Sequence, residues 1–168
     1  QTLEMLRATL LSIVDVSPYL NSVYMTLDDH EFFFTSTDGL QAISSYYDKD
    51  WQQDIAELTD KNDVLIKRRL LHNGTSFQKK EVISVYKQML LLRGALIANI
   101  DADQFEAELT GEIQEAMDTF FVVSQAGEIL ASNAKGSGMG EAMLSYLANH
   151  PSPQDEISQW VRLDGELY

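Results

Sequence analysis

Three strand-like segments follow one another in the middle of the chain, and their short connections restrict the fold. Val64 to Leu71 ends in His72-Asn73-Gly74-Thr75, which is a type I′ hairpin signal. Glu81 to Leu92 is rich in Val, Ile and Tyr, and Arg93-Gly94 separates it from the apolar segment Ala95 to Ile100. Strands joined by such tight turns pair antiparallel. The segments therefore predict an antiparallel sheet, with Ala95 to Ile100 as a central strand buried on both faces.

The N-terminal part predicts a helix followed by a hairpin. Residues 1 to about 17 carry apolar side chains at helical spacing, and Ser17-Pro18 ends this pattern because the residue before proline avoids the α region. Val23 to Leu27 and Phe32 to Thr35 are strand-like on either side of a polar turn. Asp38 is placed to cap a short helix that would reach Tyr47.

Two further helices complete the predicted order. One short helix runs from Asp48 or Asp50 to Leu58, and an acidic helix runs from Asp103 to about Met117, with a cap at Asp103. The order is then helix, two strands, helices and three antiparallel strands. This order predicts a mixed α/β (α+β) fold of PAS-like plan, in which helices back a five-stranded sheet.

The same pattern begins again near residue 118. Thr119 to Val123 and Ile129 to Ser132 predict a second hairpin, Glu141 to Asn149 predicts a helix, and Val161 to Tyr168 begins another strand pair. We therefore expect an N-terminal stalk helix in residues 1–22, a PAS-like ligand-binding unit in residues 23–117 and part of a second PAS-like unit in residues 118–168.

Composition excludes several classes of function. A net charge of −14 argues against nucleic-acid binding, which needs clustered Lys and Arg. The absence of cysteine excludes disulfides, thiolate metal sites and cysteine nucleophiles. The chain has no apolar run of the ~20 residues that span a bilayer. It begins at Gln1 without an initiator methionine, so we expect a piece of a longer protein with any membrane anchor elsewhere.

Most of the basic residues lie in one block in the middle of the chain. This block indicates either a solvent-exposed strand face or a contact with an anionic ligand or an acidic neighbour. Its members are Lys67, Arg68, Arg69, Lys79, Lys80, Lys87 and Arg93.

Two groups of residues are candidates for ligand binding. Tyr46, Tyr47 and Trp51 lie close together in sequence, and the alternative for them is packing of aromatic rings into the core. Asn99 and Asp101 alternate on the predicted central strand, so they share a face. Buried polar groups need partners, which a ligand, the protein or the next helix can supply.

Metal and phosphate sites are weakly indicated. Asp101-Ala102-Asp103 is similar to a short acidic motif that holds a metal in glycosyltransferases, but helix capping explains it as well. The glycine-rich residues 136–140 match no common phosphate-binding fingerprint. The three histidines lie far apart in predicted turns, so we expect no metal, no cofactor and no catalytic site.

The segments Phe33 to Trp51 and Val82 to Phe105, including Gly94-Ala95-Leu96-Ile97-Ala98-Asn99-Ile100-Asp101, resemble the double Cache domain. This family forms the extracellular sensor modules of bacterial chemoreceptors, histidine kinases and membrane-bound transcription regulators. The resemblance implies a membrane-distal unit that binds a small molecule and a smaller membrane-proximal unit. It is closest to sensors of Gram-positive histidine kinases and of transmembrane regulators with an AraC-type DNA-binding domain.

The resemblance also implies where a ligand binds. The amino-acid-binding branch uses an Arg-x-Trp-Tyr motif and a strand aspartate, which align here with Lys49-Asp50-Trp51-Gln52 and Asn99. Lysine lacks the bidentate fork of arginine, and an amide replaces the carboxylate, so a neutral ligand such as a sugar is expected in place of a plain amino acid. The implied ligand-binding residues are Tyr46, Tyr47, Lys49, Trp51, Tyr86, Asn99 and Asp101.

We therefore expect a non-enzymatic extracellular sensor domain of a membrane receptor from a Gram-positive bacterium. It would bind a small organic molecule. Leu3, Leu6 and Leu10 of its N-terminal helix would either pair with a second copy in a homodimer or pack against the chain's own sheet. The first alternative is a ligand-free structural or dimerising PAS-like domain, whose pocket its own side chains fill, for instance Phe34 or Tyr86. The second is a hydrolase or transferase that uses Asp101 and Asp103 with a metal.

Overall fold

A computed structural model describes most of the chain. The described residues are 2–58, 64–72, 74, 79–89, 93–113, 119–124, 126–134, 138–149, 162–163 and 166–167. The chain divides into two compact units, residues 1–104 and residues 105–168, and each is described by itself. The predicted boundary after residue 117 lies outside the described residues, and the assignment of distal and proximal units stays a prediction.

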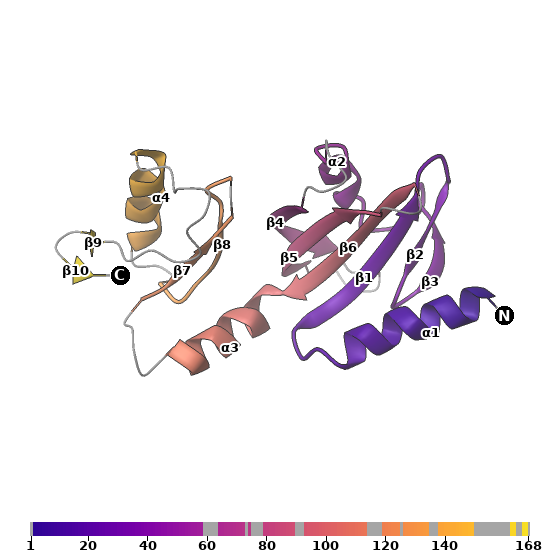
Figure 1. Cartoon of the computed structure of the whole chain (residues 1–168), viewed down its shortest axis with the longest axis horizontal. Coiled ribbons are helices and arrows are strands. Elements are labelled where there is room, and N and C mark those ends of the chain that lie inside the picture. Colours follow the sequence, from indigo (N-terminus) through magenta and orange to yellow (C-terminus); the bar gives the residue numbers. More distant parts are fainter. Residues whose placement is uncertain are drawn as a thin grey trace. The chain divides into compact units, whose positions relative to one another are not determined.

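The first unit is built on a six-stranded antiparallel sheet (Figure 1). The order across the sheet is β3-β2-β1-β6-β5-β4. The strands are β1 (Leu20–Leu27), β2 (Phe32–Thr35), β3 (Gly39–Ala42), β4 (Val64–His72), β5 (Lys79–Gln88) and β6 (Gly94–Asp101). Without the edge strand β3, this is the predicted five-stranded PAS-like sheet, and the mixed α/β fold class is confirmed.

Strand β3 replaces the helix predicted from Asp38 to Tyr47, so that prediction was wrong. Thr35 Oγ1 accepts hydrogen bonds from the backbone N–H of Thr37 and Asp38, which closes a tight turn. Gly39 then takes a φ of +74°, which glycine adopts without steric cost, and opposes Thr35 in the β2–β3 ladder. The chain therefore returns along β2 as a strand.

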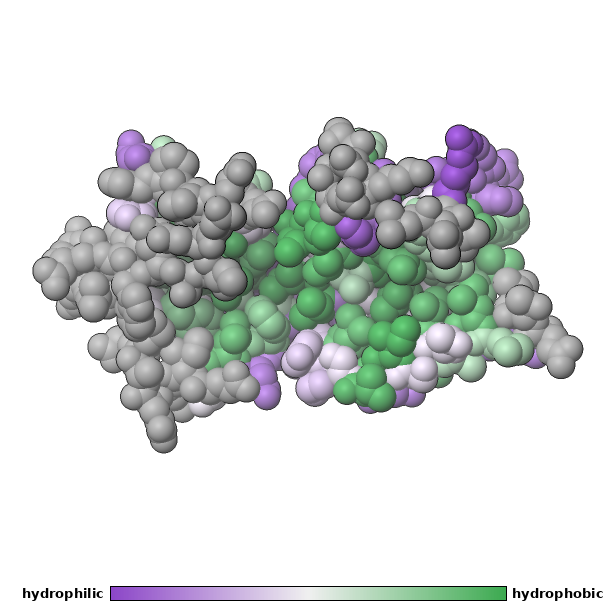
Figure 2. Space-filling model, in the orientation of Figure 1, coloured by the Kyte–Doolittle hydropathy of each residue, from purple (hydrophilic) through white to green (hydrophobic). Residues whose placement is uncertain are grey.

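The central strand β6 is buried on one face only, so the prediction that both of its faces are buried was wrong. Ala95, Ile97 and Asn99 are almost fully buried, whereas Leu96 between them is 37% exposed. The cause is incomplete cover: helix α1 (Thr2–Asp15) packs against β1 and β2 on the second face of the sheet. Leu70 and Val64 on β4 share that face with Leu96 and are also partly exposed. Hydrophobic residues accordingly reach the surface of this unit in Figure 2.

Two apolar clusters lie on opposite faces of the sheet. On the α1 face, Leu10 packs against Val23 and Phe34. The other face carries the short helix α2 (Trp51–Ile55) and a cluster dominated by aromatic rings. The buried members of that cluster are Tyr24, Phe33, Tyr46, Trp51, Leu58, Tyr86 and Ile97.

Strand β6 leads directly into helix α3 (Ala102–Ile113), as Figure 1 shows. Asp101 Oδ1 accepts a hydrogen bond of 3.1 Å from the backbone N–H of Gln104, which is the geometry of a helix N-cap. The cap predicted at Asp103 is therefore supplied by Asp101. The predicted end of this helix near Met117 lies outside the described residues.

The second unit contains the predicted hairpin and helix. Strands β7 (Phe121–Val123) and β8 (Ile129–Ser132) pair antiparallel, and Gly127 takes a φ of +81° in the turn between them. Helix α4 (Met139–Asn149) packs Met143 against Phe121 and Ile129. The short strands β9 (Arg162–Leu163) and β10 (Glu166–Leu167) pair near the end of the chain.

Candidate functional site

A buried polar network lies on the α2 face of the sheet. The ladders place Ser22 of β1 and Ser84 of β5 directly opposite Asn99 of the central strand β6. Because opposed residues in antiparallel strands project to the same face, the three side chains meet. Asn99 Nδ2 donates to Ser22 Oγ at 3.0 Å, and Ser84 Oγ donates to Asn99 Oδ1 at 2.7 Å. All three residues are at most 2% exposed.

Arg69 of β4 brings a positive charge into this network. Its Nε donates to Ser84 Oγ at 2.8 Å, and its Nη2 donates to Asn99 Oδ1 at 3.0 Å. The Arg69 side chain is 8% exposed. Two neutral groups on neighbouring strands therefore fix the plane of the guanidinium.

Asp48 supplies the matching negative charge from the segment that precedes α2. Arg69 Nη1 donates to Asp48 Oδ1 at 2.7 Å and Nη2 donates to Oδ2 at 3.0 Å, so the pair is bidentate. The Tyr24 hydroxyl donates to Oδ2 of the same carboxylate at 3.0 Å. The Asp48 side chain is 0% exposed, which makes this a buried ion pair.

Protonation states follow from this arrangement. Burial alone lowers the pKa of Arg69, but the hydrogen bonds and charge of Asp48 outweigh it and raise that pKa overall. Burial raises the pKa of Tyr24, and the Asp48 charge and hydrogen bond raise it further. At neutral pH the network therefore holds a charged guanidinium and a protonated phenol, both of which donate hydrogen bonds to Asp48.

Aromatic rings enclose the Asp48 side of the network. Trp51 is 2% exposed, and its Nε1 donates to the backbone carbonyl of Asp48 at 2.9 Å. Its ring centroid lies 5.0 Å from that of Phe33 and 6.3 Å from that of Tyr24. This contact fixes the start of α2 against the sheet.

A second set of polar contacts lies beside α2. The hydroxyl of the fully buried Tyr86 donates to Asp54 Oδ2 at 2.5 Å. Lys67 Nζ lies 2.9 Å from Asp54 Oδ1 and 2.7 Å from Glu57 Oε1. The α2 segment, residues 48–57, is thus joined to β4 by ion pairs at both ends, through Asp48 before the helix and through Asp54 and Glu57 at its other end.

Tyr46, at the edge of the aromatic cluster, also contacts Tyr47 and Asp38. The rings of Tyr46 and Tyr47 stack with centroids 4.1 Å apart. The Tyr46 hydroxyl lies 2.8 Å from Asp38 Oδ2, and the Tyr47 hydroxyl lies 2.6 Å from the same oxygen. Tyr47 is 40% exposed, and its ring lies so close to Gly74 that a Cβ there would meet ring carbon Cδ1 at 2.3 Å. Gly74 therefore has to remain glycine unless the ring moves.

The structure brings together some of the residues predicted to bind a ligand and separates others. Tyr46, Trp51 and Tyr86 share the aromatic cluster, and Asn99 lies at the centre of the polar network. Lys49 is exposed and donates to the Ser44 carbonyl at 2.6 Å. The ligand-binding role expected for these five residues stays a prediction.

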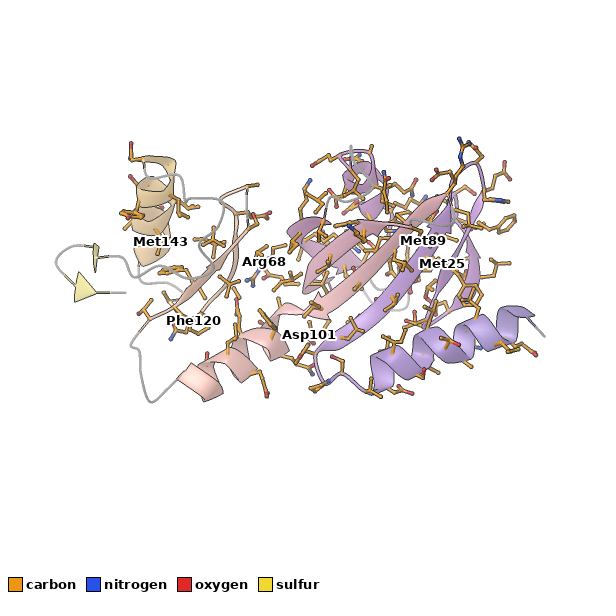
Figure 3. The ribbon with its side chains drawn as sticks, in the orientation of Figure 1. Met25, Arg68, Met89, Asp101, Phe120 and Met143 are labelled. Carbon is orange, nitrogen blue, oxygen red and sulfur yellow. The ribbon has the colours of Figure 1, made fainter. Side chains whose placement is uncertain are left out.

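Asp101 has partners other than the polar network. It lies at the junction of β6 and α3 (Figure 3), where Lys80 Nζ is 2.6 Å from its Oδ2 and the N-terminal turn of α3 donates to its Oδ1. These contacts agree with the capping role considered for Asp101. Among the described residues, no group of three or more His, Cys, Asp or Glu side chains could hold a metal ion.

Sequence reasoning did not select the residues that form most of the network. Arg69 was grouped with the basic block, for which either a solvent-exposed strand face or contact with an anionic ligand or an acidic neighbour was predicted. Its acidic neighbour is Asp48, which was considered only as a start of α2. The available signal was alternation: Leu65, Arg69 and Leu71 share the face of β4 that packs toward α2. A charged residue at a period-two position of a buried face needs a buried partner of opposite sign.

Comparison with solved structures finds sensory domains of bacterial chemoreceptors. The sensory domain of the Campylobacter jejuni chemoreceptor Tlp3 with isoleucine bound matches with a TM-score of 0.53 and 15% identity, over 98% of this chain and 65% of that chain. A second Tlp3 structure, with 4-methylisoleucine, has a TM-score of 0.48 at 15% identity, over 98% of this chain and 64% of that chain. The domain of the Pseudomonas aeruginosa amino acid chemoreceptor PctC with GABA has a TM-score of 0.41 at 16% identity, over 99% of this chain and 78% of that chain.

The match to the first Tlp3 structure confirms the Cache resemblance at the level of fold. The chain spans 65% of the length of the first Tlp3 structure. No protein-family model matches the sequence, and no curated protein matches it. No helix within the described ranges is both long and apolar enough to cross a bilayer.

Proposed function

We propose that this chain is the extracellular small-molecule-sensing domain of a bacterial transmembrane signalling receptor. The observation that carries the proposal is the buried network of Asp48, Arg69 and Asn99 between the α2 segment and the central strand. The fold shared with the Tlp3 sensory domain supports it. The chain would act by binding and would catalyse no reaction.

The cost of burying the charges of Asp48 and Arg69 suggests that this pair does more than stabilise the fold. Removing two charges from water costs several kcal/mol per ion in practice, and well-packed apolar residues of similar volume are often as stable as a buried ion pair. Asp48 and Arg69 are 0% and 8% exposed at their side chains. A chain that needed only a core at this position would be served by leucine and methionine. Hydrogen-bonding groups on three strands suit recognition of a polar molecule.

The route from the site to the second unit runs along β6. Asn99 contacts Arg69, and Asp101, two residues later, caps α3 and pairs with Lys80. A ligand that displaces Asn99 or its partners would shift β6 and therefore the start of α3. Sensing then amounts to a difference in ligand affinity between two arrangements of this strand and helix.

The finer predictions belong to the same proposal. The output would be a histidine kinase or an AraC-type regulator, and α1 would pair with its copy in a homodimer. The similar proteins from Campylobacter and Pseudomonas belong to Gram-negative bacteria, so the expected Gram-positive origin has no support from them. Because the matched Tlp3 structure holds isoleucine, amino acids belong in the ligand panel beside the predicted sugars.

A ligand-free structural domain is the second candidate. It is favoured by the complete burial of Tyr86 and by the way the charges of Asp48 and Arg69 satisfy one another. It predicted a site filled by the chain's own side chains, for instance Phe34 or Tyr86. Among the described residues, Tyr86 is buried on the α2 face, whereas Phe34 packs on the α1 face.

A calorimetric ligand screen distinguishes the two candidates. The chain is titrated with sugars, amino acids and organic acids, and each hit is repeated on Asn99→Ala and on Asn149→Ala. We expect a hit whose affinity falls at least ~10-fold in Asn99→Ala, which corresponds to about 1.4 kcal/mol. Asn149→Ala is the matched control, because Asn149 is an exposed asparagine of α4 that lies outside the network. A folded protein that binds nothing across the panel would favour the structural domain.

A further inference from the structure

Arg69 already holds a carboxylate, and that carboxylate belongs to the chain itself. Both Nη atoms of Arg69 contact Asp48, at 2.7 and 3.0 Å. We propose that Arg69 is the receptor for the carboxylate of a small-molecule ligand, and that Asp48 occupies this position when the ligand is absent. The inference rests on the sensing function proposed above and names the chemical class of its ligand.

The guanidinium stays in place without Asp48. Ser84 accepts from Nε and Asn99 accepts from Nη2, and these two acceptors are themselves hydrogen-bonded at 2.7 Å. Asn99 is held in turn by Ser22 at 3.0 Å. All three acceptors stand on paired strands of one sheet. A planar donor fork fixed by rigid elements is pre-organised for a free carboxylate, which needs the same two parallel hydrogen bonds.

Asp48 is the partner that can leave. It lies between β3, which ends at Ala42, and α2, which begins at Trp51, in a stretch without regular helix or strand. Its other contacts are the hydroxyl of Tyr24 and the bond from Trp51 Nε1 to its backbone carbonyl. Tyr24 would donate to an incoming carboxylate as it donates to Asp48.

The exchange conserves charge at Arg69 and frees the start of α2. The guanidinium has one anionic partner before and after, so no unpaired buried cation is created. Asp48 moves into water, where its charge is solvated. The ligand competes with a tethered group whose effective concentration is at least on the order of millimolar, so its apparent affinity is weakened by that competition. This class of ligand differs from the neutral molecule that Lys49 and Asn99 suggested, because Arg69 supplies the charge that those residues lack.

Chemical rescue tests the proposal directly. In Asp48→Ala the tethered carboxylate is removed, and acetate is the free equivalent of the lost side chain. Melting temperatures are measured in sodium acetate and in acetamide with sodium chloride at equal ionic strength. We expect acetate to raise the melting temperature of Asp48→Ala by roughly 5–10 °C at about 100 times its Kd, and to raise that of the unmodified chain much less.

Two controls isolate Arg69. Asp54→Ala removes a carboxylate that pairs with Lys67 and leaves the Arg69 site filled, so acetate should not stabilise it selectively. Asp48→Ala/Arg69→Gln lacks the receptor and should not respond to acetate. Equal stabilisation of Asp48→Ala by acetate and acetamide, or an undiminished response in the double variant, would overturn the proposal.

A second variant covers failure of Asp48→Ala to fold. Asp48→Asn keeps the shape of the side chain and presents a neutral competitor, so acetate should still raise its melting temperature while acetamide does not. Absence of that difference would also overturn the proposal. If the calorimetric screen finds a ligand without an acidic group and acetate rescues neither variant, the sensing function stands and the carboxylate site does not.

Discussion

The two faces of the six-stranded sheet are stabilised in different ways. The α1 face is held by aliphatic and aromatic contacts, with Leu10 against Val23 and Phe34. The α2 face combines aromatic rings with a buried ion pair and the hydrogen bonds around Asn99. Apolar contacts are non-directional and tolerate exchange at constant volume, whereas the ion pair needs particular atoms at particular angles. The α2 face therefore depends on particular polar side chains, whereas the α1 face depends mainly on apolar volume.

The largest expected effect breaks the α2 face at its charge pair. Arg69→Met leaves the carboxylate of Asp48 buried without a cation, which we expect to lower the free energy of unfolding by about 3–5 kcal/mol in urea denaturation. In Arg69→Met/Asp48→Asn both charges are gone, so most of the loss should be recovered. A double variant as unstable as Arg69→Met alone would show that packing, rather than charge, is decisive.

A somewhat smaller effect is expected on the α1 face. Leu10 is 6% exposed, and Leu10→Ala removes its contacts with Val23 and Phe34. We expect a loss of about 2–3 kcal/mol, at the lower end of the range for buried leucines because α1 can settle onto the sheet. Leu10→Met should cost less than ~1.5 kcal/mol by the same measurement. If Leu10→Met lowers the free energy of unfolding as much as Leu10→Ala does, the α1 face depends on the exact shape of its side chains as much as the α2 face depends on its ion pair.

Asp101, at the junction of β6 and α3, should make the stability of the fold depend on pH in the acid range. Burial by itself raises the pKa of Asp101, but hydrogen bonds from Lys80 and from the α3 backbone lower it overall. A carboxyl with a lowered folded-state pKa stabilises the fold above the pKa that it has when unfolded, and this stability is lost as the pH falls through the folded-state value.

Asp101→Asn keeps a capping side chain and removes this charge. We expect the free energy of unfolding to fall by about 0.3–1 kcal/mol at pH 7, and to decline less steeply than in the unmodified chain below about pH 4. Urea denaturation at a series of pH values measures both effects. Glu108→Gln, an exposed acid on the same helix, is the control. An unchanged acid profile in Asp101→Asn would contradict the assignment.

The smallest effect is expected at the outer ion pairs of α2. The Lys67 side chain is 27% exposed, and that of its partner Glu57 is 54% exposed. Solvent and salt screen such contacts, so Lys67→Met should cost at most ~1 kcal/mol, and the cost should shrink in 1 M salt. A loss comparable to that of Arg69→Met would show that α2 is held from its outer end.

Local signals were enough to predict most of the sheet. The antiparallel pairing of β4 with β5 and of β5 with β6 was predicted from glycine positions and strand periodicity, and it is confirmed. The type I′ turn predicted at Asn73-Gly74 was wrong, because His72 pairs with Lys79 and not with Thr75. Strand β3 was missed because it has only four residues and begins in a turn that Thr35 and Gly39 close. Burial of both faces of β6 was predicted from its apolar composition alone, which cannot reveal how far α1 extends over the sheet.

The site was harder to predict because its partners are distant in sequence. The aromatic residues Trp51 and Tyr86 were identified, since their size alone suggests an important position. Arg69 and Asp48 are separated by 21 positions, and Asn99 and Ser22 by 77. Only the strand order places these residues together, so composition and spacing could not distinguish Arg69 from its exposed neighbours.

The strand order also divides the sheet into two local meanders, β3-β2-β1 and β6-β5-β4. Within each meander, successive strands are joined by short connections, but the seam between them pairs Leu27 with Gly94 and Ser22 with Asn99. Closing a long loop costs entropy before any contact across it is gained, so each meander can form early and the β1–β6 seam late. Asp48 follows the first meander along the chain, and Arg69 lies on β4 of the second. The ion pair at the centre of the site therefore also links the two meanders, and we expect it to form late in folding, together with the β1–β6 seam.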